Sequence, residues 1–210
     1  KYDFIYGAAG VHPEHAEELC APGAYQKLTE CLKNSKVVAL GEIGLDYHYE
    51  DNPDRKIQQK VFEMQLELAA EMNKPVIIHS RDAAADTFDI MKEMQAENTG
   101  GIIHCFSYGK EMAGKYLDKG FYIGIGGVLT FKNARVIKEV ASEIPLSSIV
   151  LETDSPYLAP VPYRGKRNNS MYLKEVVKQL AQIKQVSEET VITTTLANAK
   201  RLYRLEENCG

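Results

Sequence analysis

The stretch VVALGEIGLD (Val37–Asp46) decides the fold class, because a near-continuous apolar run carries an acidic residue, Glu42, towards its end. Four other apolar runs end on residues of similar chemistry, namely PVIIHSRD (75–82) on His79, GIIHCFS (101–107) on His104, IVLETDSP (149–156) on Asp154 and FIYGAAGVHP (4–13) on His12. In an α/β barrel all strands point the same way, so residues at their C-terminal ends converge on one face. These carboxylates and imidazoles therefore predict a hydrolytic metal site.

The apolar runs alternate with segments of helical spacing. Strands are predicted at Phe4–Gly10, Val37–Ile43, Pro75–His79, Gly101–Cys105, Phe121–Gly126 and Ile149–Glu152, whose near-continuous apolar character is typical of parallel strands covered on both faces. Helices are predicted at Ala24–Lys33, Arg55–Met72, Ala83–Gln95, Met112–Lys119, Ala134–Glu143, Tyr172–Gln182 and Glu188–Leu205. Asn52-Pro53 is expected to start the second helix and Lys74-Pro75 to end it.

Strict β/α alternation leaves an open doubly wound sheet or a closed barrel. The segment GAAG (Gly7–Gly10) lacks the phosphate-binding fingerprint of the open sheet, and ligand-type residues at five strand ends favour a TIM-type (β/α) barrel. Six strands are too few for eight β/α units. We therefore expect residues 1–210 to form a single barrel domain that lacks its first two β/α units, as an N-terminally incomplete hydrolase would.

Composition limits the classes of protein to consider. The chain has 210 residues, 44% of them hydrophobic, and a net charge of −4, which argues against a dedicated nucleic-acid coat protein but permits an enzyme with a local basic patch. It has no apolar stretch of membrane-spanning length, so no membrane partner is expected. The scattered Cys20, Cys31, Cys105 and Cys209 predict neither a disulfide framework nor a zinc ribbon, and fit a cytoplasmic location.

Four residues are the candidate metal ligands, namely Glu42, His79, His104 and Asp154. Two of them, Glu42 and Asp154, are also the candidate catalytic residues. Glu42 has glycines nearby that let the backbone approach a bound ion, and a carboxylate there could bridge two metals. His79 and His104 suit zinc, manganese or iron as neutral imidazole ligands. Asp154 could hold a metal and accept a proton from the attacking water, while Glu152 is expected to be structural. Taken singly, each has an ordinary alternative: a carboxylate paired with lysine, a core histidine or a turn former.

Substrate contacts are predicted at the loops beside these residues. Arg81 could hold a phosphate, and His12 is either a solvated loop histidine or a substrate contact. His15 and His48 are predicted to be surface residues. Cys105 is expected to point away from His104 and to pack in the interior, if the strand alternates there.

The segment after Asp154 is basic. Between Pro160 and Gln185 it holds one acidic residue, Glu175, against six basic ones, namely Arg164, Lys166, Arg167, Lys174, Lys178 and Lys184. The sequence RGKRN (164–168) follows the candidate site closely, so Arg164 and Lys166 are predicted to clamp substrate phosphates. The three later lysines read as a solvated helix face.

Together these motifs resemble the TatD family of metal-dependent deoxyribonucleases. The matching elements are Gly10-Val11-His12-Pro13, Gly41-Glu42-Ile43-Gly44-Leu45-Asp46, His79-Ser80-Arg81, His104-Cys105-Phe106-Ser107, Glu152-Thr153-Asp154-Ser155-Pro156 and Arg164-Gly165-Lys166. The resemblance implies a TIM-type barrel with one or two divalent metal ions (Mg²⁺, Mn²⁺ or Zn²⁺) that cleaves DNA phosphodiester bonds with a metal-activated water. Single-stranded DNA or strand ends would be the substrate.

The resemblance also implies roles for individual residues. Glu42 would bridge both metals, His79 and His104 would hold the second metal, and Asp154 would bind the first near the nucleophilic water. His12, Arg81 and Arg164 would face the scissile phosphate. The family's first strand carries a His-x-His pair that these 210 residues do not contain.

Two further hypotheses remain open beside the nuclease. One is an amidohydrolase-like enzyme that cleaves C–N or ester bonds, since similar barrels and ligands serve both chemistries. The other is a truncated, inactive or DNA-binding barrel. The RGKRN loop favours the nuclease, because a neutral amide substrate does not need a cluster of cations.

Overall fold

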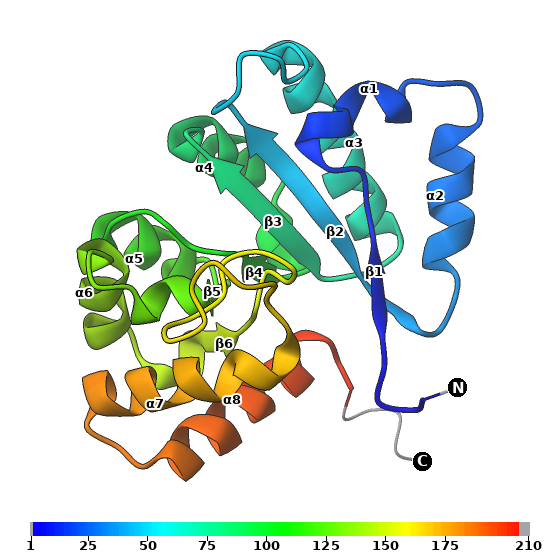
Figure 1. Ribbon diagram of the computed structural model, residues 1–210. Helices are drawn as coiled ribbons and strands as arrows, with labels where there is room; N and C mark the ends of the chain where they lie inside the picture. Colours follow the sequence, from blue (N-terminus) through cyan, green and yellow to red (C-terminus); the bar gives the residue numbers. More distant parts are fainter. Residues whose placement is uncertain (1, 206–210) are drawn as a thin grey trace. The chain divides into compact units, whose positions relative to one another are not determined.

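The computed structural model describes residues 2–205, and within them it has six β-strands (Figure 1). The strands are β1 (Gly7–Ala9), β2 (Val37–Asp46), β3 (Val76–Arg81), β4 (Gly101–Ile103), β5 (Tyr122–Ile125) and β6 (Ile149–Leu151). Their order in the sheet is the order in the sequence, and the β1–β2, β2–β3 and β5–β6 pairs are parallel. A sequential order without reversal is typical of a TIM-type barrel rather than a doubly wound sheet. The sheet is not closed.

Helices connect the strands, and every predicted strand and helix is present. The α-helices are α1 (Ala16–Leu19), α2 (Ala24–Leu32), α3 (Arg55–Glu71), α4 (Ala84–Glu93), α5 (Lys110–Asp118), α6 (Arg135–Glu143), α7 (Leu173–Lys184) and α8 (Glu188–Leu202). Short 3₁₀ helices are η1 (Pro13–His15), η2 (Ala96–Asn98), η3 (Gly127–Thr130), η4 (Leu146–Ser148) and η5 (Ser170–Tyr172). Helix α1 and the 3₁₀ turns were not predicted, because one turn of helix has no detectable periodicity.

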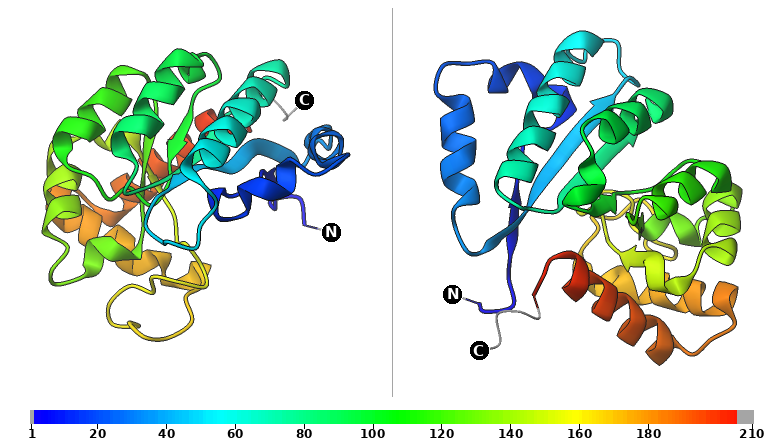
Figure 2. Two further views of the ribbon diagram at one scale, coloured as in Figure 1. Left: turned by 90° about the horizontal axis from the view of Figure 1, so that it is seen from above. Right: turned by 180° about the vertical axis from the view of Figure 1, so that it is seen from behind.

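The chain divides into two compact units, of which the first comprises Lys1–Ile102. Its core lies between β2, β3 and helix α3, which packs on β2. The right-hand view of Figure 2 shows α3 lying over these strands. Leu40, Ile43 and Ile78 from the strands are fully buried, as is Phe62 from α3. Burial of both faces of the strands explains why β2 reads as a continuous apolar run.

The second unit comprises Ile103–Gly210. Helix α8 packs on β6 and beside α7. The buried side chain of Asn198 fixes α8, because its amide nitrogen donates to the carbonyl oxygens of Leu146 at 2.9 Å and Ile149 at 2.8 Å. The prediction of a single domain over residues 1–210 stays a prediction.

Several boundaries differ from their predictions, as where β2 continues past the predicted Ile43 to Asp46 and β4 ends at Ile103 rather than at Cys105. The segment Phe4–Tyr6 was assigned to the first strand, but β1 begins at Gly7 because these side chains are exposed and have no core to face. Helix α3 begins at Arg55, as its predicted range has it, but the capping residue is Asp54 rather than Asn52, because the side chain of Asp54 accepts a hydrogen bond from the backbone nitrogen of Lys56. The side chain of Asn52 instead donates to Asp46.

No helix within residues 2–205 is both long and apolar enough to cross a membrane. Among the described cysteines, Cys20, Cys31 and Cys105 form no disulfide bond. Cys209 lies outside the described residues.

Candidate functional site

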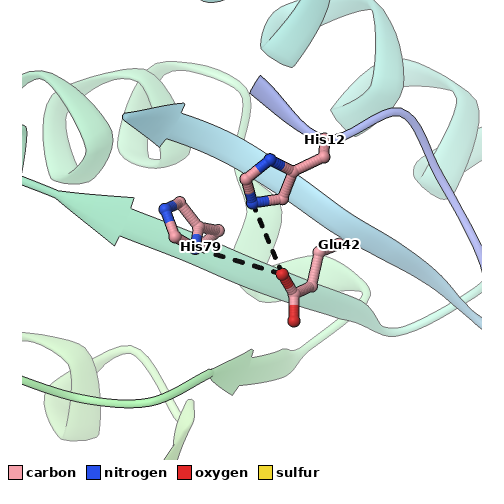
Figure 3. A group of neighbouring side chains, drawn as sticks. All are labelled: His12, Glu42 and His79. Carbon is pink, nitrogen blue, oxygen red and sulfur yellow. Dashed lines mark ion pairs between the residues drawn. The ribbon is translucent and has the colours of Figure 1, made fainter. Parts of the chain in front are cut away.

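Three of the predicted site residues meet in the first unit, around the carboxylate of Glu42 (Figure 3). The Oε2 atom of Glu42 lies 3.5 Å from Nε2 of His12 and 4.0 Å from Nδ1 of His79. The two imidazole rings lie edge to face, with 4.5 Å between their centroids. His12 is therefore not a solvated loop histidine, because it faces a carboxylate and a second histidine.

The strand carrying Glu42 departs from regular pairing at this residue. The register between β2 and β3 shifts between Gly41 and Ile43, while Gly44 pairs with His79. A shift in register re-aims the side chain at that point, as β-bulges beside active sites do. It thereby brings the Glu42 carboxylate towards the imidazole from the neighbouring strand.

Gly44 allows β2 and β3 to approach closely where His79 is placed. Its φ is +142°, and a Cβ built on it would lie 2.0 Å from the carbonyl oxygen of His79. A side chain at Gly41 would similarly lie 2.5 Å from Cβ of Ile77. Glycine at these two positions is thus a steric requirement of the strand pair that carries Glu42 and His79.

A buried carboxylate holds the other nitrogen of His79. Oδ2 of Asp46, a residue with only 1% of its surface exposed, lies 2.8 Å from Nε2 of His79. When Nε2 carries the proton and donates it to Asp46, Nδ1 has a lone pair, and this atom faces Glu42. Carboxylate–histidine pairs of this kind orient metal-binding imidazoles and fix their tautomer.

Asp46 is itself fixed by donors. Its Oδ1 accepts from the backbone nitrogen of His48 at 2.9 Å and from the side-chain amide of Asn52 at 3.1 Å. Gln58 exchanges two hydrogen bonds with the backbone of Asp46, at 2.8 and 2.9 Å. No role was predicted for Asp46, although its even spacing from Glu42 in one strand was the signal that could have found it.

A second group of candidate ligands lies in the second unit. Nδ1 of His104 lies 2.5 Å from Oε2 of Glu152, and Nε2 of His104 lies 3.7 Å from Oδ1 of Asp154. Oε1 of Glu152 accepts from the backbone nitrogen of Cys105 at 2.6 Å. Glu152 therefore orients His104 as Asp46 orients His79, and the side chain of Glu152 is less exposed than that of Asp154.

The prediction that Cys105 points away into the interior is wrong. Strand β4 ends at Ile103, and Cys105 has a φ of +46°, so strand alternation does not extend to it. Its sulfur, a nitrogen of His104 and an oxygen of Glu152 all lie within 4.8 Å of one another. Cys105 is only partly buried.

The donor atoms of both groups fit a divalent metal ion. The ligand-type atoms of His12, Glu42 and His79 also lie within 4.8 Å of one another, and imidazole with carboxylate is a donor set that zinc and manganese accept. Burial lowers the pKa of His12, and the nearby His79 lowers it further against the opposing effect of Glu42. A lowered pKa keeps an imidazole neutral, which is the form that binds metals.

Of the cations predicted to bind phosphate, Arg164 and Lys166 are exposed and Arg81 is half-buried. In the first unit, Arg81 lies over the ring of Tyr49, 4.9 Å from its centroid, and donates to the Tyr49 hydroxyl at 3.2 Å. In the second unit, the guanidinium of Arg164 lies 3.8 Å from the centroid of Phe131, and Lys166 lies 6.0 Å from that of Tyr163.

The remaining histidines lie at the surface, as predicted. His15, the last residue of η1, pairs with Glu18 of α1 at 3.5 Å, and His48 pairs with Asp82 at 2.7 Å. The structure thus groups His12, Glu42 and His79 in one unit and His104 with Asp154 in the other. The metal-binding and catalytic roles of these residues stay predictions.

Comparisons with known proteins agree with this chemistry. The profile of the family described as TatD related DNase matches residues 1–204. The metal-dependent hydrolase YabD of Bacillus subtilis is 46% identical over 205 residues, which cover 98% of this chain and 80% of YabD. A protein of Pantoea vagans named 3'-5' ssDNA/RNA exonuclease TatD is 34% identical over 207 residues, which cover 96% of this chain and 79% of that protein.

A solved structure has the same fold. The crystal structure of YJJV, a TatD homolog from Escherichia coli, matches this chain with a TM-score of 0.90 and 30% identity, over 97% of this chain and 78% of that one. The match confirms the predicted α/β fold of the TIM-barrel type. Because the family profile covers nearly the whole chain and relatives exceed 40% identity, the chain belongs to the TatD-related DNase family of metal-dependent hydrolases.

Proposed function

We propose that this hydrolase cleaves phosphodiester bonds of DNA, in single strands or at strand ends. The observation that carries the proposal is a carboxylate–histidine–carboxylate arrangement that occurs once in each unit. In the first, Asp46 binds one nitrogen of His79, whose other nitrogen faces Glu42. In the second, Glu152 binds one nitrogen of His104, whose other nitrogen faces Asp154.

The residues of this arrangement have separate roles in the proposal. Glu42 and His79 would hold metal in the first unit, His104 and Asp154 would do so in the second, and His12 would contact the substrate. A bound divalent ion would supply a Lewis acid that neutralises charge on the phosphoryl group and lowers the pKa of water. Asp154, about a third of whose side chain is exposed, accepts the proton of the attacking water.

Arginine and lysine side chains are proposed to bind the negatively charged phosphates of the substrate. Arg81, held by the ring and hydroxyl of Tyr49, presents a guanidinium whose remaining donors suit phosphate oxygens. Arg164 and Lys166 belong to a segment without acidic residues and are proposed to bind the strand. Support for DNA comes from the family description and from the name of the Pantoea relative.

Cleavage of end-labelled single-stranded DNA in Mg²⁺ or Mn²⁺ tests the substrate class. We expect shortened strands, because metal ions and cations at the site would offset the charge that slows phosphodiester hydrolysis. The assay compares DNA with a neutral aryl ester and an aryl amide at equal concentrations. Intact DNA together with metal-dependent hydrolysis of the ester or amide would contradict the nuclease and favour the amidohydrolase-like alternative.

Replacing Asp46 by Asn is expected to weaken divalent metal binding by about 10- to 100-fold, the usual effect of losing a carboxylate behind a histidine ligand. Oδ1 of Asp46 accepts from two donors, so the new amide nitrogen must turn towards Nε2 of His79. An NH₂ group there donates to Nε2, so the proton of the neutral imidazole moves to Nδ1. Nδ1 is the atom that faces Glu42, and it can then no longer bind a metal.

Calorimetric titration of the metal-free variants with Mn²⁺ measures this effect. Asp82→Asn is the matched control, because Asp82 is exposed and pairs with His48 rather than with His79. Equal Mn²⁺ affinities of Asp46→Asn, Asp82→Asn and the unaltered chain would exclude His79 as a ligand positioned by Asp46.

A further inference from the structure

We propose that Tyr157 stacks on a base of the nucleic-acid substrate and so positions the strand beside Asp154. This inference rests on the proposed function and assigns a substrate-positioning residue to it. The residues concerned are 155–169, SPYLAPVPYRGKRNN, called the basic loop below. The loop lies in the second unit between β6 and η5 and is drawn in yellow in Figure 2 (left).

The charge of the basic loop suits a polyanion. Arg164, Lys166 and Arg167 are exposed, and no acidic residue occurs between Asp154 and Glu175. The guanidinium of Arg164 is stacked on Phe131, which fixes its plane and leaves the N–H groups at its edge for phosphate oxygens.

Hydrogen bonds hold the start of the loop to the turn that carries Asp154. The backbone nitrogen of Tyr157 donates to the carbonyl oxygen of Asp154 at 2.8 Å. The buried Asn168 joins the two ends of the loop, because its side chain donates to the carbonyl oxygen of Thr153 at 2.6 Å and its backbone nitrogen to that of Pro156 at 3.0 Å. The backbone of Tyr157 is therefore fixed relative to the candidate catalytic carboxylate.

The ring of Tyr157 differs from the other aromatic rings of this region. Tyr163 stacks on Tyr172, with 3.8 Å between the ring centroids and 6° between the planes, so these rings stabilise the loop itself. Tyr157 is 69% exposed. Keeping so much aromatic surface in water has no stabilising effect on the fold, and a rigid backbone that presents such a ring is suited to binding.

An exposed aromatic ring together with several cations is the combination that binds single-stranded nucleic acids. Cations follow the phosphates, while the ring stacks on a base of any sequence, since every base has a π-face. A stacked base would hold the adjoining phosphate at a fixed distance from the turn of Asp154. Tyr157 therefore contributes to positioning rather than to the bond-breaking step.

Binding of two oligonucleotides tests the stacking directly. One is a phosphorothioate-linked thymidine strand of about ten nucleotides, which resists hydrolysis, and the other is an abasic strand with the same phosphorothioate linkages, length and charge. Fluorescence anisotropy with the Mg²⁺-loaded chain measures both affinities. We expect Tyr157→Ala to weaken binding of the thymidine strand by about 5- to 10-fold and to leave binding of the abasic strand unchanged.

Two further variants complete the experiment. Tyr157→Phe keeps the ring and should bind the thymidine strand as the unaltered chain does. Ile192→Ala removes a half-exposed side chain from α8 in the same unit and should change neither affinity. Equal losses for both strands in Tyr157→Ala, or no loss for either, would overturn the inference. Binding is measured with strands that are not cleaved, so it does not depend on catalysis. If the chain bound the thymidine strand in this base-dependent way but cleaved no DNA, only the proposed function would be refuted.

Discussion

Asp154→Asn is expected to lower the rate of metal-dependent hydrolysis on the order of 10³-fold, about the cost of removing one stabilising group from an active site. Asn keeps the size of the side chain but loses the negative charge and the proton-accepting oxygen. It also tolerates the φ of +51° at this position, so the turn that begins with the Asp154 carbonyl oxygen is preserved. The fold should therefore survive while the reaction fails.

Initial rates with labelled single-stranded DNA measure the effect at saturating Mn²⁺. The matched control is Asp118→Asn, an exposed aspartate at the end of α5 in the same unit, which should retain full activity. Circular dichroism and a thermal melt verify that both variants are folded. An Asp154→Asn variant that cleaves as fast as the Asp118→Asn variant would remove Asp154 from the catalytic residues.

Gly44→Ala is expected to lower the free energy of unfolding by about 3–5 kcal/mol, the largest stability effect that we predict. The added Cβ would lie 2.0 Å from the carbonyl oxygen of His79, and this neighbour is backbone that cannot rotate away. Strand β2 would have to separate from β3, which would also displace Glu42 from His79.

Urea denaturation of the purified chain measures the loss of stability. Gly100→Ala is the control, because Gly100 also has a positive φ, +70°, but has open space around it. Strain alone should cost this control about 1–2 kcal/mol. If the two variants unfold at the same urea concentration, the close approach of the strands at Gly44 is not a constraint.

The elements that were predicted from the sequence are those with long apolar patterns. Strand β2 and helix α3 are examples, since both of their buried surfaces are encoded in continuous or periodic apolar positions. Their neighbours are less well marked. The run Phe4–Tyr6 is apolar and yet exposed, which a pattern of residue types cannot reveal.

The candidate site was predicted residue by residue, but its supporting contacts were not. Glu42 and His79 could be chosen because their chemistry is unusual at the ends of apolar strands. The role of Asp46 depends on a distance of 2.8 Å to His79, which only the pairing of β2 with β3 creates. The position of Cys105 depends on its positive φ just after β4, and the alternation of side chains along a strand does not predict this φ.

The central claim is that the hydrolysis of DNA requires divalent metal, which the candidate histidine and carboxylate ligands would bind. The most direct measurement is the rate of strand shortening by the chain before metal removal with EDTA, after it, and after Mn²⁺ is restored. We predict that shortening stops in EDTA and recovers with Mn²⁺, with no recovery in Asp154→Asn. Undiminished cleavage in excess EDTA would contradict the account.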